Sequence, residues 1–417
     1  MTTKYRQFFP WQQPDVIAQE LINTWGEDGF IWLDGDNSNL GRWITLAVDP
    51  IEQVCCRGLP HENSSSNPFE ALRSLKRGHW TGWLSYEAGA WIEPSNPWKS
   101  DEMAMLWIAS HDPVVKFDLK EQKLWIEGNH EKRFKEMSQW LSDLSTERKR
   151  DKTSTKIAVN SWHSLTPKIN YTQSVKNIKN WINEGDIFQA NLANCFTTNI
   201  PKQICSLEIY KKLRNFCPAP FGGMMVGKGE AKHEAIMSVS PERFLKVLPN
   251  GVIETRPIKG TRPRYSNKKK DSAMAIELVC STKDRAENIM VVDLLRNDLG
   301  KVCIPGSIHV SQLVALESYS QVHHLTSVIK GCLSPDKTWI DLLEACWPGG
   351  SITGAPKLRA CQRLFELEKK ARGPYCGSFL HLNWDNTFNS NILIRSIMKI
   401  KSTLKAYAGC GIIAESD

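Results

Sequence analysis

One lysine stands in an unusual setting within the segment RPIKGTRPR, residues 256–264. Lys259 lies between two prolines and is followed at once by Gly260 and Thr261, a composition that predicts a turn. A neutral lysine amine is a nucleophile, whereas a charged one binds anions. The residue types leave three roles open for Lys259: a surface charge, an anion contact or a nucleophile.

Acidic side chains supply a second kind of chemistry. Asp284 and Glu287, in STKDRAENIMVVDLLRNDLG, are three residues apart and would share one face of a helix. Two carboxylates so placed can hold Mg²⁺, partly through water, although an isolated pair is more often a solvated first turn. Glu242, in SPERFL, lies at a predicted strand end and could be a general acid or base, or the ion-pair partner of a nearby arginine.

A glycine-rich turn precedes a predicted helix in WPGGSITGAPK, residues 347–357. Its backbone N–H groups and the positive end of the helix dipole favour an anion, and Ser351 and Thr353 add hydroxyl groups. The spacing to Lys357 does not match that of a phosphate-binding loop. A capped helix start is the simpler explanation of this segment taken alone.

Further polar candidates follow the acidic helix. His323 and His324 are adjacent at the start of a helix-like run, so we expect at most one of them to face a reaction centre. Other residues could bind carboxylates through a phenol, a guanidinium or backbone N–H groups. These residues are Tyr375, Arg395, Gly409 and Gly411.

The elements that must position these residues come in blocks. Apolar residues at helical spacing predict a helix over 171–184, and residues 286–300 predict another. Residues 235–258 predict two strands joined by a Pro-Asn-Gly turn at 249–251, and residues 391–414 predict two more. Blocks of strands and helices, rather than strict alternation, favour an α+β fold with largely antiparallel sheets.

Composition places the chain among globular proteins. Its 417 residues suffice for two domains or one large composite unit, and 41% are hydrophobic and 24% charged. We find neither an apolar run long enough to span a membrane nor a secretory signal. The 12 cysteines are scattered and predict neither a disulfide framework nor a zinc site, which fits the reducing environment of the cytoplasm.

The net charge of +8 raises the question of nucleic-acid binding. The basic residues are spread along the chain, and the densest run, at 267–270, is short. A modest positive field suits small anionic substrates equally well. We therefore expect neither a nucleic acid nor a membrane as a partner.

Several of these segments resemble, in the same order, motifs of the chorismate-utilising enzymes. This family includes anthranilate synthase component I, aminodeoxychorismate synthase component I, isochorismate synthase and salicylate synthase. The resemblance covers residues 171–417 closely and the N-terminal part more loosely. It implies an α+β fold in which layered, mainly antiparallel sheets enclose the active site, flanked by helices. The segments are DIFQANL, PAPF, SPERF, ETRPIKGT, KDRAENIMVVDLLRNDLG, HL at 324–325, GGSITGAPK, YCGS, AGCGIIAESD and, in the N-terminal part, WTGWLSYEAG.

Within this family the residue at Lys259 separates two branches. The anthranilate-forming enzymes usually read P-I-A-G-T there, and the aminodeoxychorismate-forming enzymes read P-I-K-G-T, as this chain does. The resemblance therefore implies conversion of chorismate and ammonia to 4-amino-4-deoxychorismate, for p-aminobenzoate and folate synthesis, through a covalent Lys259 adduct at ring C2. Ammonia would come from a glutamine amidotransferase partner. Two alternatives stay open: anthranilate synthase component I, and an inactive family member that docks an amidotransferase.

The resemblance also implies roles for the candidate residues. Glu287 would be a direct Mg²⁺ ligand and Asp284 a ligand through water. Glu242 would be the acid–base group, and His324, rather than His323, the active-site histidine. Substrate-binding positions would be Gly260, Thr261, Ser351, Thr353, Tyr375, Arg395, Gly409 and Gly411.

Three segments organise the chain on this basis. Residues 1–145 form an N-terminal region, residues 146–165 a polar linker and residues 166–417 the chorismate-binding core. Family members continue beyond the segment that matches AGCGIIAESD into a helix with further acidic metal ligands. We therefore expect the core to be truncated at its C-terminal end.

Overall fold

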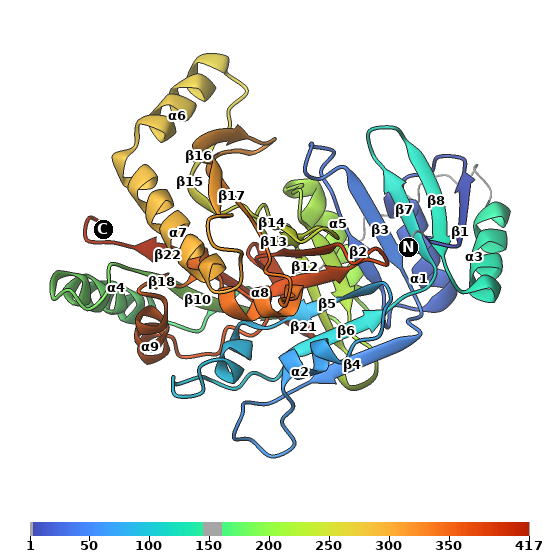
Figure 1. Cartoon of the computed structure of the whole chain (residues 1–417), viewed down its shortest axis with the longest axis horizontal. Helices are drawn as coiled ribbons and strands as arrows, with labels where there is room; N and C mark the ends of the chain where they lie inside the picture. The colour runs from blue at the N-terminus through green and yellow to red at the C-terminus, as the bar shows by residue number, and fades with distance from the viewer. Residues whose placement is uncertain (1–2, 145–160, 417) are drawn as a thin grey trace.

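A computed structural model describes residues 3–144 and 161–416. Two large sheets form its centre, and the paired strands within each run antiparallel. Helices flank both sheets (Figure 1). This architecture confirms the predicted α+β class with mainly antiparallel sheets.

The first sheet has twelve strands within the described residues. They are β1 (Tyr5–Phe9), β2 (Ile31–Leu33), β3 (Trp43–Ala47), β7 (Val114–Asp118), β8 (Lys123–Gly128), β9 (His163–Ser164), β10 (Gln189–Asn199), β11 (Gly223–Val226), β12 (Glu234–Ser238), β18 (Gly354–Ala355), β21 (Ser396–Ile400) and β22 (Thr403–Ile412). Their spatial order is β1-β8-β7-β3-β2-β11-β12-β21-β22-β10-β18, and β9 pairs with β10.

The second sheet has ten strands in the part of the chain that the structure describes. They are β4 (Glu52–Cys56), β5 (Trp80–Leu84), β6 (Leu106–Ser110), β13 (Arg243–Val247), β14 (Val252–Thr255), β15 (Ile258–Pro263), β16 (His309–Ser318), β17 (Val322–Cys332), β19 (Ser378–Leu382) and β20 (Phe388–Asn391). Their order is β15-β17-β14-β13-β20-β19-β5-β6-β4, and β16 pairs with β17.

Helices cover the outer faces and one end of the molecule. In Figure 1, α6 and α7 stand beside β15, β16 and β17, at the end of the molecule away from β1 and β8. The α-helices are α1 (Pro14–Trp25), α2 (Pro68–Arg73), α3 (Glu131–Asp143), α4 (Lys168–Asn183), α5 (Ser206–Phe216), α6 (Lys268–Cys280), α7 (Thr282–Gly300), α8 (Trp339–Cys346) and α9 (Lys357–Leu367). Short 3₁₀ helices are η1 (Tyr86–Trp91), η2 (Gly229–Ala231) and η3 (Gly350–Ile352).

Strands β2 and β11, in the middle of the first sheet, are buried on both faces, and successive residues of each strand point to opposite sides. Ile31 and Met225 enter a core that lies between the two sheets. Their neighbours Trp32 and Met224 enter a second core, formed with α1, α3 and α5. The sheet is thus a middle layer between the second sheet and these three helices.

Strands from distant parts of the sequence lie side by side in both sheets. Leu33 of β2 is opposite Gly223 of β11, and Trp83 of β5 is opposite Phe379 of β19. The N-terminal segment and the later segment therefore share both sheets. The predicted linker, 146–165, falls largely outside the described residues, and the segment boundaries stay predictions.

Most predicted elements are confirmed, with shifted ends. The helices at 171–184 and 286–300 are α4 and α7, and the strands at 391–414 are β21 and β22. Residues 235–258 form three strands rather than two, and the predicted turn joins β13 to β14. The prediction of a helix-like run that begins at His323 is wrong, since these residues form β17.

Two further observations bear on the setting of the protein. No helix within residues 3–144 and 161–416 is long and apolar enough to cross a membrane. All 12 cysteines are free thiols.

Candidate active site

Lys259 lies in strand β15, not in the predicted turn. The pairing of β15 with β17 shifts register between Lys259 and Thr261. Gly260, at this shift, has φ +81°, and a Cβ there would lie 2.9 Å from the Cβ of Asp284. Only glycine fits a backbone of this conformation at so close an approach. The bulge therefore brings the lysine strand against the first turn of α7.

The Lys259 amine is half-buried beside two carboxylates. Burial lowers its pKa, and the negative charges of Glu287 and Glu242 oppose this effect without reversing it. The lowered pKa favours the neutral amine, which is the form that can attack an electrophile.

The neighbouring arginines do not explain the lowered pKa of this amine. Arg256 forms an ion pair with Glu317, and Arg262 pairs with Glu277 and Asp284. The sequence left burial and nearby cations as alternative causes. The structure favours burial, because both guanidinium groups are matched by carboxylates of their own.

Glu242 immediately precedes β13 and is 4% exposed. Burial raises the pKa of its carboxyl to about 7, although the Ser351 hydroxyl and the charges of Lys259 and Arg395 favour the ionised form. A carboxyl that titrates near neutrality is suited to accept and return a proton. The contacts also show that Glu242, Lys259, Ser351 and Arg395 converge in the fold.

The two carboxylates of α7 lie on the side of the helix that faces β15. Burial raises the pKa of Glu287; the carboxylates of Asp284 and Glu415 add to this effect, and Lys259 and Lys283 oppose it. A divalent cation would relieve the repulsion among these carboxylates.

The set of metal ligands is nevertheless partial. The Asp284 carboxylate is engaged by Arg262, at 3.1 Å. No group of three or more His, Cys, Asp or Glu side chains within the described ranges is arranged to hold a metal ion. Mg²⁺ commonly takes one or two protein carboxylates and completes its shell with water and substrate oxygens, so a two-carboxylate site fits that ion.

His324 faces the lysine strand from β17 and is 1% exposed. Its Nδ1 lies 2.9 Å from the Thr261 Oγ1, and its Nε2 is buried without a partner among the described residues. Burial, and then the charge of Arg395, lower the pKa of His324 to about 4, so the imidazole is neutral near pH 7. His323, on the other face of the strand, instead contacts Ser318.

Two glycines of β22 allow side chains to approach its backbone closely. A Cβ at Gly409 would lie 3.2 Å from the Tyr375 hydroxyl, and one at Gly411 would lie 2.3 Å from the Gln189 Nε2 and 3.5 Å from the Glu287 Oε2. The backbone of β22 thus lies against the Glu287 carboxylate and the Tyr375 phenol. Tyr375 itself is buried and stacks on Tyr407 at 4.9 Å between ring centroids.

Gln189 was not singled out from the sequence, although its contacts place it with the predicted site. It is 2% exposed, and its Oε1 has no partner within the described residues. The available signal is a polar amide next to the apolar residues Ile187, Phe188 and Ala190. A buried amide with one free acceptor can orient a small polar ligand.

The two hydroxyls of the glycine-rich turn have different partners. The Ser351 hydroxyl acts on Glu242 and opposes the rise of its pKa. The Thr353 hydroxyl instead donates to the Gly349 carbonyl at 3.0 Å, and Thr353 is fully buried. In this structure Thr353 therefore stabilises the turn, whereas Ser351 lies near Glu242.

Two cavities differ in their relation to the predicted site residues. A small cavity brings His324 and Arg395 together with Pro218 and Tyr319. A larger one, of about 500 Å³, lies between the start of α5 and the strands β12 and β21, and none of the predicted site residues lines it. The chemistry of the side chains, rather than the size of a hollow, locates the site.

Comparisons with known proteins point to one enzyme family. Residues 29–417 match the family described as chorismate binding enzyme. The chain is 36% identical over 344 residues to a Synechocystis protein named anthranilate synthase component I-like protein, and the match covers 82% of this chain and 69% of that one. It is 39% identical over 257 residues to aminodeoxychorismate synthase component 1 of Salmonella typhimurium, over 62% of this chain and 55% of that one.

A solved structure is similar as well. The crystal structure of anthranilate synthase component I from Streptococcus pneumoniae superposes with a TM-score of 0.76 at 25% identity, covering 91% of this chain and 89% of that one. The matches to the two relatives by sequence span 69% and 55% of their lengths.

Proposed function

The chain belongs to the chorismate-binding enzyme family, and we propose that it is an aminodeoxychorismate synthase component I, which converts chorismate and ammonia to 4-amino-4-deoxychorismate. The relative from Salmonella typhimurium carries that name. The observation that carries the proposal is the environment of Lys259: a half-buried amine of lowered pKa beside Glu242 and Glu287.

The lysine explains how nitrogen would reach ring C4 with retained configuration. In the first step the neutral Lys259 amine bonds to C2, both ring double bonds shift around C1, C6 and C5 toward C4, and the C4 hydroxyl leaves. In the second step ammonia bonds to C4, both double bonds shift back, and the C2–lysine bond breaks with its electron pair returning to the amine. Two displacements place nitrogen where the hydroxyl was and return the free lysine.

Glu242 balances the protons of both steps. Its carboxyl, with a pKa of about 7, donates a proton to the departing hydroxyl, which leaves as water. The carboxylate so formed then takes a proton from the attacking ammonia. Burial of Glu242 makes both transfers possible near neutral pH, because neither form is strongly favoured.

Mg²⁺ would be held by Glu287 directly and by Asp284 through water, as the carboxylates of α7 allow. When bound, the ion would clamp the substrate ring carboxylate and make C2 more electrophilic. The Tyr375 phenol, the Arg395 guanidinium and the backbone at Gly409 and Gly411 would bind the substrate carboxylates.

A glutamine amidotransferase subunit would supply the ammonia. The designation "component 1" of the Salmonella relative supports a second component. The 12 free cysteines favour the cytoplasm as the location of this reaction, because thiols stay reduced there.

A product assay tests the proposal. The purified chain is incubated with chorismate, Mg²⁺ and ammonium salt, and the products are resolved by chromatography. We expect 4-amino-4-deoxychorismate without pyruvate, and loss of turnover when a chelator removes the metal.

Anthranilate with pyruvate would overturn the proposal in favour of the anthranilate synthase alternative. A chain that binds an amidotransferase but does not convert chorismate under these conditions would overturn it in favour of the inactive docking protein.

A further inference from the structure

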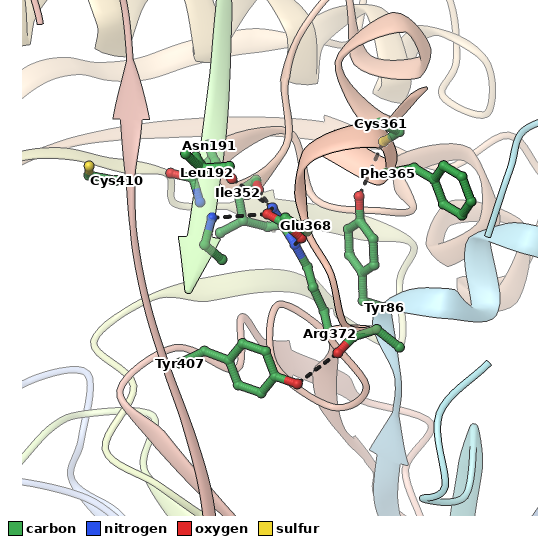
Figure 2. A network of polar contacts seen from close by, with 12 residues as sticks. Tyr86, Asn191, Leu192, Ile352, Cys361, Phe365, Glu368, Arg372, Tyr407 and Cys410 are labelled. Carbon is green, nitrogen blue, oxygen red and sulfur yellow. Dashed lines mark hydrogen bonds and ion pairs between the residues drawn. The ribbon is translucent and has the colours of Figure 1, made fainter. Parts of the chain in front are cut away.

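One buried arginine, Arg372, contacts four parts of the fold at once, and Figure 2 shows it beside Glu368, Ile352 and Asn191. Arg372 is 2% exposed, and its guanidinium donates to Glu368, to the Ile352 carbonyl at 2.9 Å and to the Asn191 carbonyl at 2.6 Å. Its backbone N–H donates to the Glu87 carboxylate at 2.7 Å. These contacts use the planar fork of arginine in three directions.

Glu368 balances the charge of this arginine. Its side chain is 10% exposed and accepts from the Arg372 Nε at 2.9 Å and Nη2 at 2.7 Å. The same carboxylate also accepts the backbone N–H of Ala193 in β10, at 2.9 Å. Burial alone would lower the pKa of Arg372, but the Glu368 charge raises it well above its usual value.

The two carbonyls belong to backbone that forms the candidate active site. Ile352 lies between Ser351 and Thr353, in the glycine-rich turn. Asn191 follows Gln189 by two residues and is paired with Gly411 in the register of β10 and β22. The guanidinium therefore links the Ser351 turn to the strand pair that approaches Glu287.

Hydrogen bonds also fix the chain on either side of Arg372. The Tyr407 hydroxyl donates to the Ala371 carbonyl at 2.7 Å, and the Tyr375 N–H donates to the Arg372 carbonyl at 3.2 Å. The Tyr375 and Tyr407 rings are stacked, with 9° between their planes. The arginine thus sits at the base of the loop that carries the Tyr375 phenol.

We propose that Arg372, held by Glu368, is a positioning residue that sets the Ser351 turn and the Tyr375 loop at the spacing that chorismate binding needs. This inference rests on the proposed function, because it names chorismate as the ligand of the site. Arg372 does not touch the reacting atoms; it acts through the backbone on either side of the substrate. The fork is required, since a lysine ammonium at this place cannot serve two carbonyls and a carboxylate in one plane.

Three variants test the proposal by chorismate binding and by steady-state kinetics. Arg372→Lys keeps the charge and removes the fork, and Glu368→Gln keeps the shape and removes the charge. Glu366→Gln is the matched control, since Glu366 is exposed near the end of α9, two residues before Glu368, and pairs with Arg363. We expect Arg372→Lys and Glu368→Gln to raise the dissociation constant and KM for chorismate about tenfold, with a smaller change in kcat, and the control to match wild type.

Hydrogen exchange supplies a readout that does not depend on activity. In Arg372→Lys and Glu368→Gln, peptides covering 349–355 and 371–377 should exchange faster than in wild type, and the peptide covering 131–143 should not change. Unchanged exchange at 349–355 and unchanged chorismate binding in Arg372→Lys would overturn the proposal. Uniformly faster exchange would also overturn it, because it would show a general loss of stability rather than local positioning.

Failure of the proposed function is distinguishable from failure of this inference. If wild type neither binds nor converts chorismate, the proposed function is wrong. If wild type binds chorismate and the two variants bind it equally well, only the positioning role is wrong.

Discussion

Lys259 is a half-buried cation and Arg372 is a buried one, and their surroundings are opposite. Arg372 has its charge matched by Glu368 and donates to two carbonyls, and its pKa is raised. The Lys259 amine lies beside Glu242 and Glu287 but makes no hydrogen bond within the described residues, and burial lowers its pKa.

The difference separates a cation that holds structure from one that is poised to react. Full pairing keeps the guanidinium charged and holds it in one position, which suits a role in fixing the backbone. Incomplete pairing leaves the amine able to lose its proton and form a bond. The two residues also lie at different sheets. Lys259 is on β15 of the second sheet, and Arg372 donates to a carbonyl of β10 in the first sheet.

The largest expected effect is on catalysis at Lys259. Lys259→Ala should lower the formation of 4-amino-4-deoxychorismate by about 10³- to 10⁴-fold, because the nucleophile is removed. Lys268→Ala, an exposed lysine at the start of α6, serves as the control and should keep wild-type turnover. Product formation by Lys259→Ala within tenfold of wild type would show that the lysine does not form the adduct.

The next largest effect is on the free energy of unfolding and should appear when Arg372 is replaced. Arg372→Met should lower the free energy of unfolding by about 3–5 kcal/mol, because Glu368 is left buried and unpaired. Lys259→Met should change it by less than about 1 kcal/mol, since no hydrogen bond is lost and Glu242 can take up a proton. Urea denaturation of both variants measures the contrast. Equal losses would abolish the distinction between the two cations.

The smallest effect concerns pH and the carboxyl beside Lys259. The pKa of Glu242 is raised to about 7 in the folded protein, so the native state binds more protons than the unfolded chain between about pH 4.5 and 7. Stability from this group therefore falls as pH rises through that window. Glu242→Gln should resemble wild type near pH 5 and be more stable by up to about 3 kcal/mol near pH 8.

Urea denaturation at several pH values measures this difference, and Lys268→Ala measured in parallel is the control, because Lys268 is exposed at the start of α6. A difference between wild type and Glu242→Gln that stays constant from pH 5 to 8 would contradict the raised pKa.

Segments with a regular apolar period or a clear turn signal could be predicted from the sequence. The apolar face of 171–184 and the Pro-Asn-Gly turn at 249–251 gave a helix and a hairpin that the structure confirms. The run at His323 was misassigned because β17 is buried on both faces over most of its length. Without alternating polar residues, such a strand has no period that distinguishes it from a buried helix.

The candidate site was only partly accessible to the same reasoning. The three-residue spacing of Asp284 and Glu287 predicted that they share one face of a helix, which is α7. The resemblance narrowed the roles of Glu242 and Lys259. The Arg372 network could not be predicted, because its acceptors include backbone carbonyls that no side-chain pattern encodes. The pairing of Asp284 with Arg262 also depends on the bulge at Gly260, which is a property of strand register.

The interleaving of strands has a consequence for how the chain acquires its structure during synthesis. β2 cannot complete its pairing until β11 has been made. In the same way β5 needs β19, and the paired residues Trp83 and Phe379 are nearly three hundred positions apart. Contacts so distant along the chain close late and slowly, since the intervening loop must first lose its conformational freedom. The early tryptophan-rich strands therefore emerge with apolar surface uncovered, and holdase chaperones would be the natural protection for the nascent chain.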